Sequence, residues 1–138
     1  MKKRSRIFRV LILSTPLLMV SALASPQSAL STALYTAAQA AKGAKAYQTT
    51  CAGCHGANLQ GGMGPALVGK PFWLSYGGKK VSTLWSAVHT TMPMTAPGSV
   101  SAKNSINIMA FLLQKNGVPA GNTPLNDTAD LSKALPAN

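Results

Sequence analysis

The pentapeptide Cys51-Ala52-Gly53-Cys54-His55 is the feature that most constrains what this chain can fold into. It contains both cysteines of the sequence, three positions apart, with a histidine directly after the second. A redox-active dithiol is expected where a strand opens a helix in a βαβ unit, whereas this pair runs into a glycine-rich loop. A zinc site needs four ligands at wider spacing, and the chain has one further histidine, His89. Both interpretations are therefore disfavoured.

Covalent haem attachment accounts for every residue of the motif. Two thiols three positions apart on a helical turn can add to the two vinyl groups along one edge of the macrocycle, and the following imidazole then faces the iron. A proximal histidine needs an acceptor for its second ring nitrogen, and the carbonyl of Pro65 is placed to provide it. For the distal position the proline-containing segment 90–99 offers Met92 and Met94, with His89 as a weaker alternative.

The rest of the sequence predicts helices joined by long loops. The expected helices cover residues 31–47, 81–90 and 101–116, and five glycines predict a loop over 56–69. Ser31 or Thr32 is the expected cap of the first helix, and Ser82 or Thr83 that of the second. No segment alternates for long in the manner of a strand, which favours an all-α domain.

Residues 1–24 have the pattern of a cleaved secretory signal peptide. A basic start is followed by an apolar run that is short for a membrane span, and the run ends in the small residues Ala22 to Ala24. We expect a flexible lead-in over 25–34, one domain over 35–118 and a C-terminal tail over 119–138. Export implies a periplasmic location in a bacterium, where haem attachment of this kind is made.

Removal of the signal leaves eight lysines, no arginine and two aspartates, Asp127 and Asp130. Nucleic-acid recognition relies on arginine forks and clustered basic stretches, so scattered lysines disfavour it. A diffuse lysine surface fits an acidic protein partner, or an anionic membrane surface for peripheral association. Plain solubility explains the same lysines equally well.

Taken together, these motifs resemble class I c-type cytochromes. The matching pieces are Gly43 and Tyr47 before the first cysteine, "CAGCHG", "GPALVG", "MPMTAPG" and "IMAFLLQKNG". The resemblance implies a cytochrome c fold of three to five helices wrapped around one covalently attached haem c. Cys51 and Cys54 would form the thioether links and His55 the proximal ligand. Met92 would be the distal ligand, because in the family the methionine directly before a proline binds the iron, and Met94 is the alternative.

More narrowly, the chain resembles cytochrome subunits and carriers of periplasmic quinoprotein or flavoprotein dehydrogenases. This implies a one-electron carrier, not an enzyme, that accepts electrons from a dehydrogenase and passes them to an oxidase, a reductase or the respiratory chain. It also implies that the helix of Gly43 crosses the terminal helix near Ala110 and Phe111. Trp73 and Trp85 are candidates for the haem pocket. The alternative function is a haem enzyme, or a gas- or peroxide-binding protein, with an open distal site.

Overall fold

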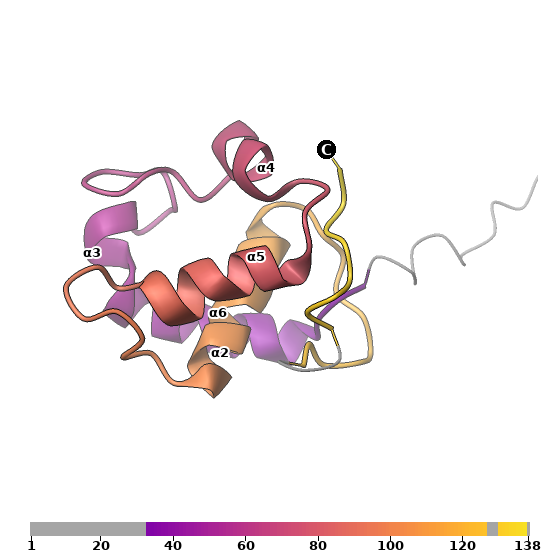
Figure 1. Ribbon diagram of the computed structural model, residues 1–138. Helices are drawn as coiled ribbons and strands as arrows, with labels where there is room; N and C mark the ends of the chain where they lie inside the picture. The colour runs from indigo at the N-terminus through magenta and orange to yellow at the C-terminus, as the bar shows by residue number, and fades with distance from the viewer. Residues whose placement is uncertain (1–32, 127–129, 138) are drawn as a thin grey trace, which may run out of the picture.

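The computed structural model describes residues 33–126 and 130–137. The predicted signal peptide and residues 25–32 of the lead-in lie outside this part of the chain. The described residues form α-helices and one π-helix, with two isolated bridges and no strand. In chain order they are α2 (Ala37–Thr50), α3 (Ala52–His55), α4 (Lys70–Tyr76), α5 (Val81–Trp85), the π-helix η1 (Ser86–Thr91) and α6 (Ala102–Lys115) (Figure 1). The predicted all-α fold is confirmed, and α4 was not predicted.

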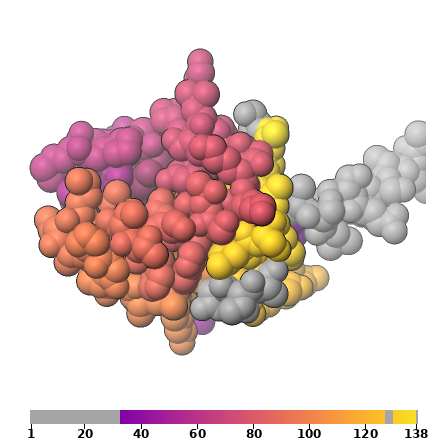
Figure 2. Space-filling model, viewed as in Figure 1, coloured from indigo at the N-terminus to yellow at the C-terminus, as the bar shows by residue number. Residues whose placement is uncertain are grey.

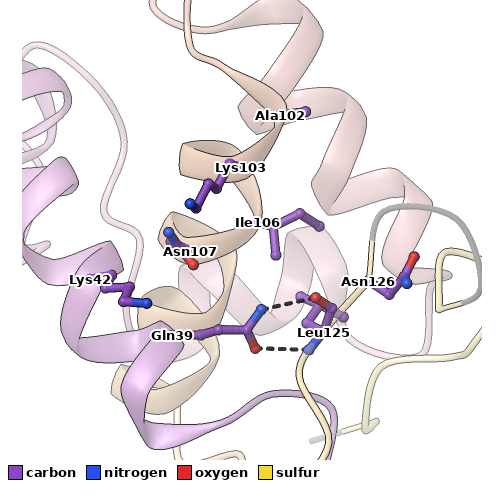
Figure 3. Close-up of a pocket in the computed structure, with 8 residues that line it drawn as sticks. All are labelled: Gln39, Lys42, Ala102, Lys103, Ile106, Asn107, Leu125 and Asn126. Carbon is purple, nitrogen blue, oxygen red and sulfur yellow. Dashed lines mark hydrogen bonds between the residues drawn. The ribbon is translucent and has the colours of Figure 1, made fainter.

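Helix α2 begins later than the sequence suggests, so the prediction of Ser31 or Thr32 as its cap is wrong. Thr36 is the cap: its hydroxyl accepts from Gln39 N at 3.3 Å, and Gln39 Oε1 accepts from Thr36 N at 3.2 Å. The amide of Gln39 also donates to Leu125 O and accepts from Leu125 N, at 2.9 and 2.8 Å (Figure 3). A contact 86 residues away along the chain therefore helps to fix where the helix starts.

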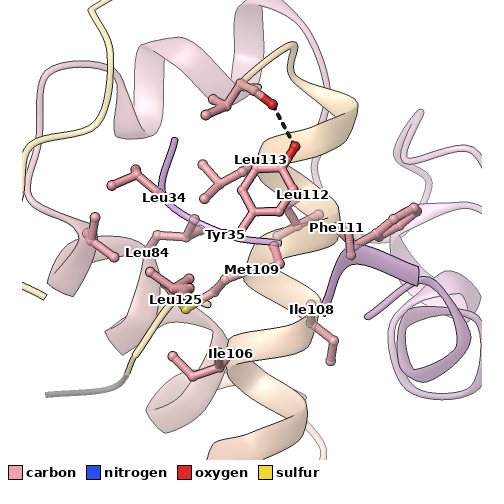
Figure 4. Packing of buried hydrophobic residues seen from close by; sticks show 14 of the residues in the cluster. Leu34, Tyr35, Leu84, Ile106, Ile108, Met109, Phe111, Leu112, Leu113 and Leu125 are labelled. Atoms are coloured by element: carbon pink, nitrogen blue, oxygen red, sulfur yellow. Dashed lines mark hydrogen bonds between the residues drawn. The ribbon is translucent and has the colours of Figure 1, made fainter. Parts of the chain in front are cut away.

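Helix α6 forms the centre of the core, and every residue from Ser105 to Leu113 is buried. Figure 4 shows its side chains packed among those of Leu34, Tyr35 and Leu84. Helix α2 crosses α6 at Gly43, where a Cβ atom would lie 1.8 Å from Asn107 O. The rings of Tyr47 and Phe111 are in contact, with centroids 5.4 Å apart. The expected crossing is present, but Gly43 meets it at Asn107, one turn earlier than Ala110.

Helix α5 lies across α6 and continues into η1, so the expected helix over 81–90 is in part a π-helix (Figure 1). The prediction of Ser82 or Thr83 as its cap is wrong, because the N-cap is Lys80 and no side chain caps the helix. Backbone carbonyls of the C-terminal tail take that role. Val81 N donates to Lys133 O at 2.8 Å and Ser82 N to Leu131 O at 2.9 Å.

The tail and the end of the lead-in are packed parts of the domain. Leu125 and Leu135 are buried, and Leu135 N donates to Lys79 O at 2.8 Å. Leu34, expected in a flexible lead-in, is also buried, and the neighbouring Tyr35 hydroxyl donates to Val118 O at 2.6 Å. Among the described residues no helix is long and apolar enough to cross a membrane.

Candidate functional site

One pocket brings together the sulfur and imidazole side chains that the sequence singles out. It has a volume of about 220 Å³ and lies between the segment 50–65 and the loop that follows η1. Figures 1 and 2 show these two segments side by side at the left of the molecule. The lining residues are Thr50, Cys51, Cys54, His55, Met63, Gly64, Pro65, Met92, Pro93, Met94 and Thr95.

The imidazole of His55 is buried and fixed in orientation. Its Nδ1 lies 2.8 Å from Pro65 O, and because a carbonyl oxygen can only accept, Nδ1 must carry the proton. This leaves Nε2 as the nitrogen with a free lone pair for a metal. Gly64 lies against the ring, since a Cβ there would come within 2.6 Å of His55 Cε1. A glycine is required at this position for the imidazole to keep its place.

The loop after His55 is tied back onto the motif, and this positions Pro65. Gly61 N donates to His55 O at 2.8 Å and Gly64 N donates to Cys54 O at 3.0 Å. The hydroxyl of Tyr47 in α2 donates to Gly56 O at 2.8 Å. The loop therefore follows the surface of α3 closely, which explains why so many glycines occur in it.

No disulfide joins the two cysteines, and Cys51 is half-buried whereas Cys54 is exposed. Burial raises the pKa of Cys51 above its ordinary value, and the neighbouring Cys54 raises it further. A dithiol oxidoreductase needs an attacking thiol of lowered pKa, so this environment disfavours thiol-exchange chemistry. Both thiols line the same pocket as the His55 ring, which is the arrangement that attachment to one planar group requires.

Three methionines line the pocket, and they differ in exposure. Met92 is half-buried, whereas Met94 is 81% and Met63 is 85% exposed. Met92 is therefore the most enclosed thioether beside the pocket. Met63 also lines the pocket, and no pattern in the sequence indicated this. None of the lining residues is a lysine or an acid.

Trp73, Trp85 and His89 are not among the residues that line this pocket. Trp73 packs edge-on against Phe72, with ring centroids 5.2 Å apart. Trp85 packs against the His89 ring at 4.4 Å. The Nδ1 of His89 lies 3.1 Å from Val100 O, in a contact that joins η1 to the start of α6.

The protein also has a larger cavity, so the site is identified by the residues that line it and not by the volume of the cavity. It has a volume of about 530 Å³ and lies between α2, the first turns of α6 and the chain near Leu125 (Figure 3). It contains Lys42 and Lys103 but no sulfur or imidazole group. The donor set for an iron porphyrin occurs only in the smaller pocket among the described residues, and the residues present there fit a haem.

Comparisons with known proteins agree with this fit. Residues 38–112 match the family model described as cytochrome c oxidase, cbb3-type, subunit III. Among solved structures, the sulfane dehydrogenase SoxCD from Paracoccus pantotrophus matches with a TM-score of 0.54 and 22% identity, over 87% of this chain and 69% of that one. At this identity the match shows the fold alone, and no curated protein matches. Because the family model covers more than half of the chain, the protein belongs to this family and is a class I c-type cytochrome.

Proposed function

We propose that the protein is a periplasmic one-electron carrier whose single haem c is bound through thioether bonds to Cys51 and Cys54. In this proposal the His55 imidazole and the Met92 thioether would hold the iron. The observation that carries it is the single pocket that contains both thiols, the fixed His55 ring and the half-buried Met92. When bound, the haem supplies one-electron chemistry, and thioether ligation raises its reduction potential relative to bis-histidine ligation.

The residues of the chain hold this centre with little freedom. The Nδ1–H of His55 donates to Pro65 O, which fixes the tautomer and increases the basicity of Nε2. The mostly apolar lining with three thioethers would place little polar surface beside a bound haem. Both properties favour a centre that changes charge with little rearrangement, because the ligands are positioned before the electron arrives.

The partner we propose is a periplasmic dehydrogenase as electron donor, with a terminal oxidase or reductase as acceptor. The structural similarity to a chain of a sulfane dehydrogenase supports a dehydrogenase partner. The lysines support an acidic docking surface on that partner. One ion pair occurs among the described residues, between Lys133 and Asp130, and the other lysines have no acidic partner within this part of the chain.

Covalent attachment is tested by extraction of the purified protein with acid–acetone. We expect the haem to stay on the wild-type polypeptide and to be extracted from, or absent in, the Cys51→Ala/Cys54→Ala double variant. Haem that resists extraction from the double variant would contradict the assignment of the two cysteines. A control for folding that keeps both cysteines is Gly53→Ala, since a Cβ at Gly53 meets nothing within 4 Å.

Distal ligation is tested by the weak long-wavelength absorption band that a thioether–iron bond gives in the ferric state. We expect Met92→Ala to abolish the band and Met94→Ala to retain it.

Carbon monoxide separates the carrier from a gas-binding protein, because an occupied distal site binds it poorly. Rapid binding of carbon monoxide by the ferrous wild type would favour the open-site alternative.

A further inference from the structure

The loop that bears Met92 has little structure of its own. Residues 92–100 make two internal backbone hydrogen bonds, from Ala96 N to Pro93 O at 2.9 Å and from Ser99 N to Ala96 O at 3.2 Å. Residues 94–99 are exposed, and only Val100 at the end of the loop is buried. A loop of this kind needs support at its ends if it is to hold a side chain at a fixed place beside the pocket.

The side chain of His89 provides that support. Its Nδ1 lies 3.1 Å from Val100 O and 3.1 Å from Ser105 Oγ. Since Val100 O can only accept, Nδ1 carries a proton and donates to this carbonyl. The ring also packs on Trp85 at a centroid distance of 4.4 Å. The loop returns past the same residue, because a Cβ at Gly98 would lie 3.8 Å from His89 O.

These contacts join the two ends of the loop. His89 is in the last turn of η1, three residues before Met92, and Val100 directly precedes the cap of α6. Ser105 is fully buried in α6, the central helix of the core. The hydrogen bond therefore closes the segment 90–99 at its base, which reduces the number of conformations that the loop can adopt. His89 lies in the π-helix η1, its ring contacts Ser105 of α6, and π-helical turns are frequent at functional sites.

We propose that His89 is a positioning residue, which holds the Met92 loop against the pocket through its hydrogen bond to Val100 O and does not itself ligate the iron. The proposal rests on Met92 as the distal ligand. The hydrogen bond of His89 lowers the free energy that is needed to keep the Met92 thioether in place. A competing ligand therefore has to displace a loop that is already closed.

The test compares His89→Phe, which keeps a ring against Trp85, with His89→Asn, whose amide N–H can replace the imidazole Nδ1–H. In the ferric holoprotein we expect His89→Phe to bind added imidazole roughly three- to tenfold more tightly than wild type, which is the effect of losing one hydrogen bond. The thioether band should weaken in proportion, and the amides of residues 94–99 should exchange hydrogen faster. His89→Asn should restore all three properties. The matched control is Thr90→Val, which removes an exposed hydroxyl that bonds within η1 to Ser86 O.

The outcomes separate this proposal from the proposed function. Unchanged imidazole affinity and amide exchange in His89→Phe would overturn the role of His89, even if Met92→Ala still abolishes the thioether band. Asn failing to restore the behaviour of a folded Phe variant would overturn the assignment of the Nδ1 hydrogen bond. If His89→Phe does not fold, His89→Leu replaces it: it also lacks a donor for Val100 O, and loop exchange no faster than wild type would count against the proposal. A band that survives Met92→Ala would instead contradict the ligand assignment, while amide exchange still reports on the loop.

Discussion

Tyr47 combines full burial with an ionisable hydroxyl, and this predicts how the protein responds to alkaline pH. Burial is the main cause that raises the pKa of Tyr47 from 10.0 to about 12. Because the folded-state pKa lies above the unfolded one, the stabilising contribution is complete below pH 10. It is lost as the pH rises through about 12, since the unfolded chain releases the phenolic proton first.

We therefore expect the free energy of unfolding to fall more steeply between about pH 9 and pH 11.5 in wild type than in Tyr47→Phe. The difference should be of the order of 1–2 kcal/mol, measured by urea unfolding at both pH values. The variant also loses the hydrogen bond to Gly56 O, so its stability at pH 9 is the reference. Parallel pH dependence in the two proteins would show that Tyr47 does not titrate in this range.

At the residue scale, the sequence predicted the site better than its surroundings. The motif and the position of Pro65 in the loop that follows it were sufficient to predict the hydrogen bond from His55 to Pro65. The structure contains this bond. The pocket lining was harder to predict, because whether Trp85 faces a haem or His89 depends on how α5 and η1 are rotated on α6. Met63 was missed because no local pattern shows that an exposed loop residue borders a pocket.

The crossing of α2 and α6 is the contact between elements that depends most on one atom. We expect Gly43→Ala to lower the free energy of unfolding by about 2 kcal/mol or more, because its Cβ would lie 1.8 Å from Asn107 O and both helices would have to separate. Intrinsic helix propensity predicts the opposite sign, since alanine stabilises a helix interior by about 1 kcal/mol over glycine. Thermal or urea unfolding decides between the two, and equal or greater stability would show that the helices can separate without cost.

The control for this substitution is Gly53→Ala in α3, where an added Cβ meets nothing within 4 Å. It should leave stability unchanged or slightly increased. A second readout is the ring contact between Tyr47 and Phe111 one turn along, because separation of the helices would move these rings apart as well.

At the element scale, the predictions failed at the caps of two helices. The central helix was predicted closely over 101–116, because Ser101 is a local cap and the apolar residues follow the helical period. The caps predicted for α2 and α5 were both wrong, although α5 begins at Val81 as predicted. At α5 the first backbone N–H groups donate to Lys133 O and Leu131 O near the C-terminus, and no local pattern reports such contacts. At α2 the local capping box of Thr36 and Gln39 was overlooked, and the Gln39 side chain also binds Leu125.

For the whole molecule, the same contacts make the tail part of the domain. Gly121 N donates to Tyr35 O at 2.7 Å, and Leu135 is buried beside the start of α5. The division into a domain over 35–118 and a tail over 119–138 stays a prediction about the sequence. The chain after α6 nevertheless binds the start of α5 through backbone carbonyls and the start of α2 through Leu125, and it supplies buried side chains to the core.

The distribution of charge leads to a prediction about electron exchange. No lysine or acid lines the pocket, while the lysines outnumber the acids over the rest of the protein. An oxidant that reacts at the pocket is therefore guided by the long-range field of the lysines and not by a charged contact. Such guidance is screened by salt, because the Debye length falls from about 30 Å at 0.01 M to about 3 Å at 1 M ionic strength.

We expect the oxidation of the reduced protein by ferricyanide, an anion, to become slower as ionic strength rises. Oxidation by a cationic cobalt(III) complex should become faster, because the same salt screens a repulsion. Stopped-flow measurements over this range give the dependence of both oxidation rates on ionic strength. A general effect of salt on the haem would change the two rates in the same direction, so opposite changes exclude it. Two rates that do not respond to salt would show that the lysines do not guide an approaching partner, and docking would then depend on the uncharged surface around Met63 and Met94.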